Sequence, residues 1–302
     1  MEQLYEATAG DTTDLYYVDT EMYDSREYGS VYILDADRPA LVDTGTGYNY
    51  ETILEGMAEV GIEPEELSVI ALTHVHLDHA GGASILAENC PNADVCIHES
   101  GARFLRDPTR IWAGTKAVMG ERIRYYREPD PIPEDRILEL EDGDTIGLGD
   151  HTLSVHHAPG HAFHQVVYHD DENDGVVTAD AAGLNLPSVD GVTQTSPPTD
   201  FHLERCLDDI AMLQELDASA LYYGHFGDRE TDDLLAEYAD VLQSWVGAVE
   251  AKREELEDDE AVIEHFVDRA ETPDAWNDEH ARGETEINVR GVLRYLDERE
   301  SP

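Results

Sequence analysis

One segment of ten residues, from Thr73 to Gly82, restricts what this chain can fold into more than any other part of the sequence. It reads Thr-His-Val-His-Leu-Asp-His-Ala-Gly-Gly, so three imidazoles and a carboxylate fall within six positions. The apolar run 67–72 before it predicts a buried strand, and residues 83–88 after it predict a helix. The histidines are therefore expected on a strand-to-helix loop, where a rigid scaffold can present metal ligands.

A histidine-rich surface loop with no metal function is the alternative interpretation of this segment. We favour a metal site because imidazole and carboxylate are the ligands of catalytic zinc-type sites, which leave one coordination position open. Ligand-type residues also follow other predicted strands, namely Asp43 after 39–42, His161 after a Pro-Gly turn, Asp180 after 175–179 and His225 after 220–223. Each is weak evidence alone, but together they extend the pattern of the first cluster.

On these residues the chain resembles the metallo-β-lactamase superfamily across roughly residues 12 to 227. The His-Val-His-Leu-Asp-His run at 74–79 is the most specific part of the resemblance, and the other four residues occur in the right order. The resemblance implies an α/β (α+β) fold, a four-layer αββα sandwich with the site at one edge of its two sheets.

The resemblance also implies two divalent metal ions and a ligand for each position. The first metal would take His74, His76 and His161, and the second would take Asp78, His79 and His225. Asp180 would bridge the two metals. Asp43 is expected to accept a hydrogen bond that fixes the orientation of a ligand. Zinc is the expected metal, and manganese or iron would accept the same ligands.

The chemistry expected of such a centre is hydrolysis. Two cations that share a water lower its pKa toward neutrality, and the resulting bridging hydroxide would attack the carbonyl of a small ester, thioester or lactone. Asp78 is expected to act as the catalytic proton acceptor. The sequence therefore predicts a metal-dependent hydrolase with a small-molecule substrate.

Several alternatives stay open within this resemblance. A mononuclear iron sulfur dioxygenase and a non-catalytic metal-binding protein are both compatible with the motif. No cysteine stands at a second-metal position, so cysteine-containing β-lactamases match poorly, whereas Asp180 points to hydrolases similar to glyoxalase II and to lactonases. His164, three residues after His161, could be a ligand if the register slips. The scattered remaining histidines, such as His280, are interpreted as ordinary polar residues.

The chain divides at residue 227 on the basis of its pattern. Residues 1–227 are expected to form the αββα domain. Residues 228–302 are expected to add a helical extension, with helices at 234–256, 260–269 and 286–299, which packs on the domain, caps the pocket or makes a homodimer contact. A helix is predicted at 109–127. Its part from Trp112 to Met119 and the loop 185–199 are the candidate pocket walls, and a solvated loop is the alternative.

Composition excludes several other classes of protein. The 302 residues are 41% hydrophobic, which is enough for a large core, and they carry a formal charge of −49 from 68 acidic and 19 basic residues. The acids are spread along the chain, which is typical of halophiles that accumulate salt, and such a surface repels nucleic acid. No run approaches the ~18 apolar residues of a membrane helix, and no signal peptide is evident, so a cytoplasmic protein without a membrane partner is expected. Three cysteines without paired spacing predict small buried side chains rather than disulfides.

Overall fold

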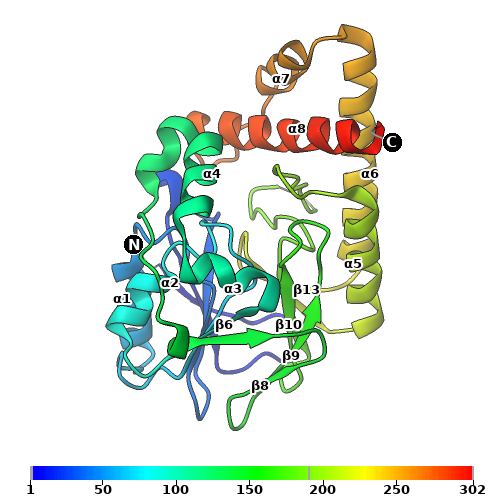
Figure 1. The fold of residues 1–302 in the computed structure, drawn as a ribbon. Coiled ribbons are helices and arrows are strands. Elements are labelled where there is room, and N and C mark those ends of the chain that lie inside the picture. The colour runs from blue at the N-terminus through cyan, green and yellow to red at the C-terminus, as the bar shows by residue number, and fades with distance from the viewer. Residues whose placement is uncertain (1–2, 190, 301–302) are drawn as a thin grey trace.

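Two β-sheets packed face to face form the centre of the computed structural model, which describes residues 3–189 and 191–300 (Figure 1). The first sheet has seven strands in the spatial order β1 to β7, antiparallel from β1 to β4 and parallel from β4 to β7. These strands are β1 (Leu4–Glu6), β2 (Leu15–Asp19), β3 (Ser30–Leu34), β4 (Ala40–Val42), β5 (Val69–Ala71), β6 (Asp94–His98) and β7 (Ile137–Leu140).

The second sheet has six strands in the order β13-β12-β11-β10-β9-β8, and only β11 and β12 run parallel. These strands are β8 (Thr145–Gly147), β9 (Thr152–His157), β10 (Val166–Asp170), β11 (Gly175–Ala179), β12 (Ala220–Tyr223) and β13 (Asp228–Glu230). The strands β1, β8 and β13 were not predicted from the sequence. Unlike β4 and β5, which are equally short, they are not continuous apolar runs.

The facing sides of the two sheets bury one apolar layer, and helices cover the outer sides. Tyr32 and Leu34 of the first sheet belong to the same buried cluster as Val155 and Tyr168 of the second. The helices are α1 (Tyr50–Glu59), α2 (Ala83–Asn89), α3 (Glu99–Arg106), α4 (Thr109–Met119), α5 (Leu203–Leu216), α6 (Leu234–Leu256), α7 (Asp259–Val267) and α8 (Asp278–Glu300). The apolar sides of α1 to α3 pack on the first sheet, and those of α5 and α6 pack on the second. The predicted αββα sandwich is therefore confirmed.

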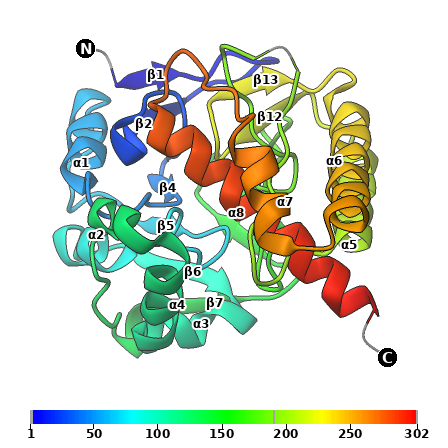
Figure 2. The ribbon, with the colours of Figure 1, turned by 90° about the horizontal axis from the view of Figure 1, so that it is seen from above.

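The long helix α8 crosses one end of the sandwich and lies over both sheets (Figures 1 and 2). It begins at Asp278, eight residues earlier than the predicted start at residue 286. The cap explains the difference, because the Asn277 side chain accepts a hydrogen bond from the backbone N–H of His280 at 2.9 Å. Its amide also donates to the carbonyl of Tyr23 at 2.8 Å, so the beginning of α8 is tied to the turn after β2.

The other helices of the predicted extension pack on the second sheet and on α8. Side chains of α5, α6, α7 and α8 share one buried apolar cluster with strands of that sheet. The segment between residue 227 and α6 includes β13, which pairs with β12 at the edge of the second sheet. A domain boundary at residue 227 stays a prediction.

The predicted helix over 109–127 is wrong in its second half. α4 ends at Met119, because Gly120 adopts a left-handed φ of 54°, and a 3₁₀ turn, η2 (Gly120–Tyr125), follows. Two further 3₁₀ turns are η1 (Met22–Asp24) and η3 (Glu134–Arg136). The predicted state of the cysteines is confirmed, since Cys90, Cys96 and Cys206 are buried and free. Within residues 3–189 and 191–300, no helix is both long and apolar enough to cross a bilayer.

Two glycine-containing loops touch backbone to backbone beside the conspicuous histidine segment. A Cβ on Gly81 would meet the carbonyl oxygens of Leu77 and Thr46, and a Cβ on Gly82 would meet the carbonyl of Thr44. Any side chain there would push apart the loop that follows β4 and the loop that follows β5. The Gly-Gly pair is therefore required by close approach of the two loops.

Replacing Gly81 with alanine should separate these loops and lower the free energy of unfolding by more than about 2 kcal/mol. The matched control is Gly247→Ala in α6, where a Cβ meets no atom within 4 Å. That control should raise the stability by roughly 0.5–1 kcal/mol through helix propensity. Urea unfolding at fixed salt measures both variants, and equal stabilities for the two would contradict the close approach.

Candidate metal centre

Every residue that the sequence analysis assigned to the metal site lies just beyond a strand, at one edge of the two sheets. Asp43 follows β4, the His74–His79 loop follows β5, and His161 follows β9. Asp180 follows β11 and His225 follows β12. Since β4 runs parallel to β5 and β11 runs parallel to β12, their carboxyl ends meet at this edge. The fold thus brings together residues that are up to 182 positions apart in the sequence.

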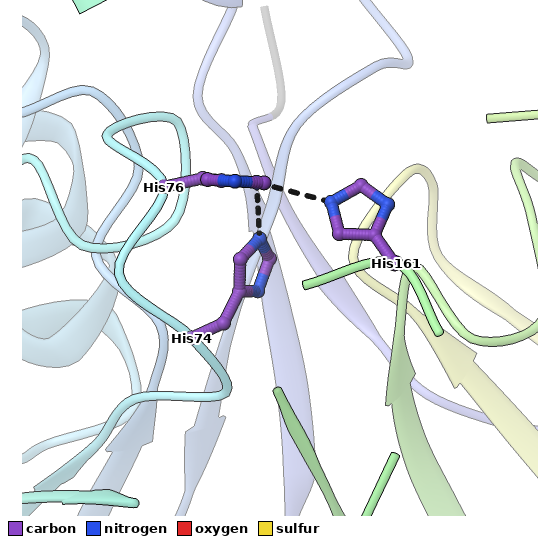
Figure 3. Close-up of side chains that lie close together, drawn as sticks. All are labelled: His74, His76 and His161. Atoms are coloured by element: carbon purple, nitrogen blue, oxygen red, sulfur yellow. Dashed lines mark hydrogen bonds between the residues drawn. The ribbon is translucent and has the colours of Figure 1, made fainter. Parts of the chain in front are cut away.

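Three imidazoles converge at one end of this cluster, as Figure 3 shows. The Nδ1 atom of His76 lies 3.1 Å from Nε2 of His74 and 3.0 Å from Nε2 of His161. Burial lowers the pKa of all three rings below the usual histidine range, well below it for His74 and to about 4 for His161. Neutral rings present nitrogen lone pairs, which are what a metal ion binds.

A second group meets the first through Asp180. Its Oδ2 atom lies 3.1 Å from Nε2 of His79 and 3.6 Å from Nε2 of both His74 and His161. Burial alone would raise the pKa of Asp180, but the surrounding rings of His161, His79 and His225 hold it below its usual range. The carboxylate is therefore charged and central.

His225 and Asp78 complete the second group. The Nε2 atom of His225 lies 3.2 Å from Nε2 of His79 and 3.5 Å from Oδ1 of Asp180. Asp78 is less buried, and its Oδ2 lies 4.0 Å from Nε2 of His225. This places a partly exposed carboxylate beside a buried imidazole, at the side of the cluster that faces the pocket.

The donor set fits metal ions on its own chemistry. The donor atoms form three groups, and within each group all of the atoms lie within 4.8 Å of one another. The groups are His74, His76 and His161; His74, His79 and Asp180; and Asp78, His79 and His225. Ring nitrogens that point at one another at about 3 Å cannot all be satisfied by protons on neutral rings. A cation held among them satisfies every lone pair, and nitrogen with carboxylate oxygen is the ligand set of zinc and its neighbours.

Asp43 fixes the orientation of two of these rings from behind. Its Oδ2 lies 2.8 Å from Nδ1 of His79, and both of its oxygens accept from the Thr73 hydroxyl at 2.9 Å. The same hydroxyl lies 3.1 Å from Nδ1 of His74. One buried carboxylate thus orients His79 directly and His74 through Thr73, and leaves the Nε2 atom of each ring directed into the cluster.

A pocket of about 370 Å³ opens onto His76, Asp78, His161, Asp180 and His225. Both predicted walls are confirmed, because α4 contributes Ile111, Thr115, Val118 and Met119, and the following long loop contributes Thr195 and residues 197–199. Two more lining residues, Glu284 and Ile287, come from α8. Neither was predicted as a pocket residue, because Glu284 precedes the predicted helix at 286–299 and Ile287 belongs to no recognisable motif.

Glu284 and Tyr28 link α8 to His225 of the candidate centre. The Tyr28 hydroxyl donates to Oε2 of Glu284 at 3.1 Å, and its ring stacks on His225 with centroids 4.4 Å apart. The backbone carbonyl of Tyr28 lies 3.2 Å from Nδ1 of His225, so it fixes that ring as Asp43 fixes His79. Nothing in the sequence around Tyr28 indicates this role, which depends on the fold.

Two other histidines, His164 and His280, are also buried. His280 is not an ordinary polar residue, because it is 1% exposed and its ring stacks on Trp276 with centroids 3.9 Å apart. His164 lines the pocket, and its ring is stacked on the ring of His74 with their centroids 6.1 Å apart. Among the described residues it belongs to none of the three groups of donors, so it is a neighbour of the cluster.

Comparison with known proteins supplies the family. The model of the metallo-beta-lactamase superfamily matches residues 25–225, which contain every residue of the cluster. The chain belongs to the metallo-β-lactamase superfamily. Its resemblance to that superfamily, inferred from the 74–79 motif, is therefore confirmed.

Curated relatives include the acyl-coenzyme A thioesterase MBLAC2 of Gallus gallus, 29% identical over 174 residues, and that of Homo sapiens, 27% identical over 175 residues. The alignments cover 53% and 52% of this chain. The chain spans 59% and 60% of the length of these relatives.

Solved structures show the same fold. The metallo-beta-lactamase superfamily protein ST1585 from Sulfolobus tokodaii superposes with a TM-score of 0.70 at 20% identity, over 93% of this chain and 99% of that one. The family protein TTHA1429 from Thermus thermophilus superposes with a TM-score of 0.66 at 22% identity, over 98% and 94%. Both alignments extend well beyond residue 225.

Replacing Asp43 with asparagine should weaken metal binding roughly 10- to 100-fold, because an amide cannot fix both His79 and Thr73 in the same way. Calorimetric titration with zinc measures the affinity. The control is Asp170→Asn, which disrupts a buried carboxylate at 3.0 Å from Nδ1 of His151 away from the cluster. An equal loss of affinity in the two variants would contradict the orienting role of Asp43.

A buried carboxyl behind His161 predicts a dependence of stability on pH. Asp209 in α5 accepts from the backbone N–H of Gly160 at 2.7 Å, and burial raises its pKa to about 7. Between about pH 4 and pH 7 the folded state keeps a proton that the unfolded chain has lost, so this group lowers the free energy of unfolding as pH rises.

Asp209→Asn should therefore gain stability relative to the wild type, by roughly 1–3 kcal/mol between pH 5 and pH 8. Urea unfolding at each pH measures the gain. The control is the neighbouring Asp208→Asn, which removes a carboxyl from an exposed position. Its free energy of unfolding, plotted against pH, should run parallel to that of the wild type. Parallel curves for all three proteins would rule out a raised pKa at Asp209.

Proposed function

We propose that this protein is a dinuclear metal-dependent hydrolase of a small ester, thioester or lactone. The observation that carries the proposal is the overlap of the three donor groups. His74 belongs to the first and second groups, and His79 belongs to the second and third. Two cations bound side by side would use all seven side chains, whereas one cation would leave part of the cluster unused.

In this proposal His74, His76 and His161 would hold one ion, Asp78, His79 and His225 would hold the other, and Asp180 would be shared between them. Zinc, manganese and iron all accept these ligands, and zinc is the metal we expect. When bound, such ions lower the pKa of a water and stabilise negative charge that develops on a carbonyl oxygen.

The side chains of this protein supply the remaining functions. Asp78 faces the pocket, so it is positioned to take a proton from the attacking water and return it to the leaving group. Asp43 and the Tyr28 carbonyl hold the rings of His79 and His225 in place. Phe104, Ile111 and Phe163 make part of the pocket apolar, which excludes bulk water and fits a hydrocarbon portion of the substrate.

A thioester is the substrate bond that the names of the relatives support, because both curated relatives described above are named as acyl-coenzyme A thioesterases. The third donor group argues against the mononuclear iron sulfur dioxygenase, since that enzyme needs one metal. Metal analysis separates the two, because a dioxygenase would contain one iron per chain and consume oxygen with a persulfide.

We propose further that the helices after residue 227 act as an extension that closes the pocket. Glu284 and Ile287 of α8 line the pocket, and Asn277 ties the start of α8 to Tyr23. Burial raises the pKa of the Glu284 carboxyl above its usual range, which agrees with an enclosed position. A homodimer and a cytoplasmic location stay predictions.

Replacing His76 with alanine should lower the metal content and the rate of hydrolysis together. The substitution removes the Nδ1 atom that lies 3.1 Å from Nε2 of His74 and 3.0 Å from Nε2 of His161. Elemental analysis should give about two metal ions per wild-type chain and fewer in the variant. A panel of thioesters, esters and lactones with added zinc or manganese measures activity. His265→Ala on α7 is the control, and unchanged metal stoichiometry in the His76 variant would reject its assignment as a ligand.

A further inference from the structure

The few basic residues of this acidic chain are concentrated beside the pocket. Seven of the 19 lysines and arginines fall within residues 103–127, which contain only two acidic residues. This segment includes α4 and the second half of α3, the helices that form one wall of the pocket. A neutral substrate would need no such concentration of cations, whereas an anionic one would be repelled by a chain of net charge −49 without it.

Five of these seven cations do not line the pocket. Arg106 pairs with Glu134 and Glu139, and Arg124 pairs with Glu279. The other three that do not line the pocket contact aromatic rings: Lys116 on Trp112, Arg122 on Tyr23, and Arg127 on Tyr50. Only Arg103 and Arg110 of the seven line the pocket.

Arg103 and Arg110 are exposed within that pocket, and no carboxylate in the described part of the chain lies within 4.0 Å of either guanidinium. The Arg103 guanidinium lies over the Phe104 ring, 4.6 Å from its centroid, and 5.6 Å from the centroid of Phe163. Both rings also contact the ring of His164, with centroid distances of 6.0 Å from Phe104 and 4.5 Å from Phe163, so they hold the Arg103 cation beside a histidine that lines the pocket.

The remaining pocket carboxylates come from other elements. Asp200 belongs to the long loop before α5, and Glu284 belongs to α8. Glu284 is already hydrogen-bonded to Tyr28 and Asn288. The α3 and α4 wall is therefore the cationic side of the pocket, with forked donors that match the oxygens of a carboxylate or a phosphate.

We propose that Arg103 and Arg110 bind a carboxylate or phosphate of the substrate, at a position separate from the carbonyl that is hydrolysed. This inference rests on the proposed function and specifies its substrate class. The substrate is an anionic ester or thioester whose charged group lies against α3 and α4 while its reacting carbonyl lies at the metal centre. Binding at the charged group then holds the carbonyl in place.

Three thioesters with the same acetyl group test this assignment. Acetyl-coenzyme A carries phosphates, S-acetylglutathione carries carboxylates, and S-acetyl-N-acetylcysteamine carries no charge. The variants are Arg103→Gln, Arg110→Gln and the double variant, with Arg205→Gln on α5 as the control, an exposed arginine outside the pocket.

The double variant should raise KM roughly 30-fold for one of the two anionic thioesters, because two charge-assisted contacts are lost. Its kcat/KM for the neutral thioester should change less than about threefold, and Arg205→Gln should change neither. The more affected substrate identifies the anion as phosphate or carboxylate. Equal losses on all three thioesters, or no loss on any, would overturn the assignment.

Equilibrium binding separates this inference from the proposed function. Calorimetry with coenzyme A and with glutathione, on metal-free protein, reports anion binding whether or not the protein hydrolyses any thioester. The wild type should bind one of them at least about tenfold more tightly than the double variant, and the difference should shrink as KCl is raised. Equal affinities would overturn the role of Arg103 and Arg110 even if the neutral thioester is hydrolysed.

Discussion

The carboxylate of Asp43 is the contact on which the geometry of the candidate centre depends. It joins the loop after β4 to the loop after β5 by accepting from the backbone and hydroxyl of Thr73, and it orients His79. Buried polar groups are costly unless they are satisfied, and this one carboxylate satisfies several at once. Gly81 and Gly82 allow the two loops to approach closely enough for these bonds to form. The positions of His74 and His79 therefore depend on the close approach of two loops at Gly81 and Gly82, neither of which is a candidate metal ligand.

Much of the fold and of the candidate site could be predicted, because the ligand-type residues stand close together in one segment or directly after apolar strands. The six positions from His74 to His79 hold four ligand-type residues behind a buried strand, and His161, Asp180 and His225 stand at strand ends, where parallel strands deliver side chains to one edge. The strands β1, β8 and β13 escaped prediction because polar residues or glycine interrupt them, whereas the equally short β4 and β5 are continuous apolar runs.

The pocket was less predictable than the cluster. Tyr28 and Glu284 act through contacts between segments that are 256 residues apart, and neither stands in a recognisable motif. The start of α8 could have been found, since Asn277 followed by acidic residues is an N-cap signal that went unused. The left-handed Gly120 that ends α4 was also visible in the sequence as a helix-breaking residue. The burial of His280, in contrast, could not be predicted, because its contacts with aromatic rings arise only when α8 packs on the rest of the fold.

The docking of α8 on the turn that follows β2 has a consequence for how the molecule opens. The two sheets and the donor cluster are built from residues before 231, while one side of the pocket is supplied by residues beyond 280. Local unfolding of the first turns of α8, before its buried residues from Val289 onward, would thus enlarge the entrance and leave the contacts of Asp43 intact. Substrate admission and metal retention would then have separate energetic controls, one set by the contacts of Asn277 and Glu284 and the other by Asp43.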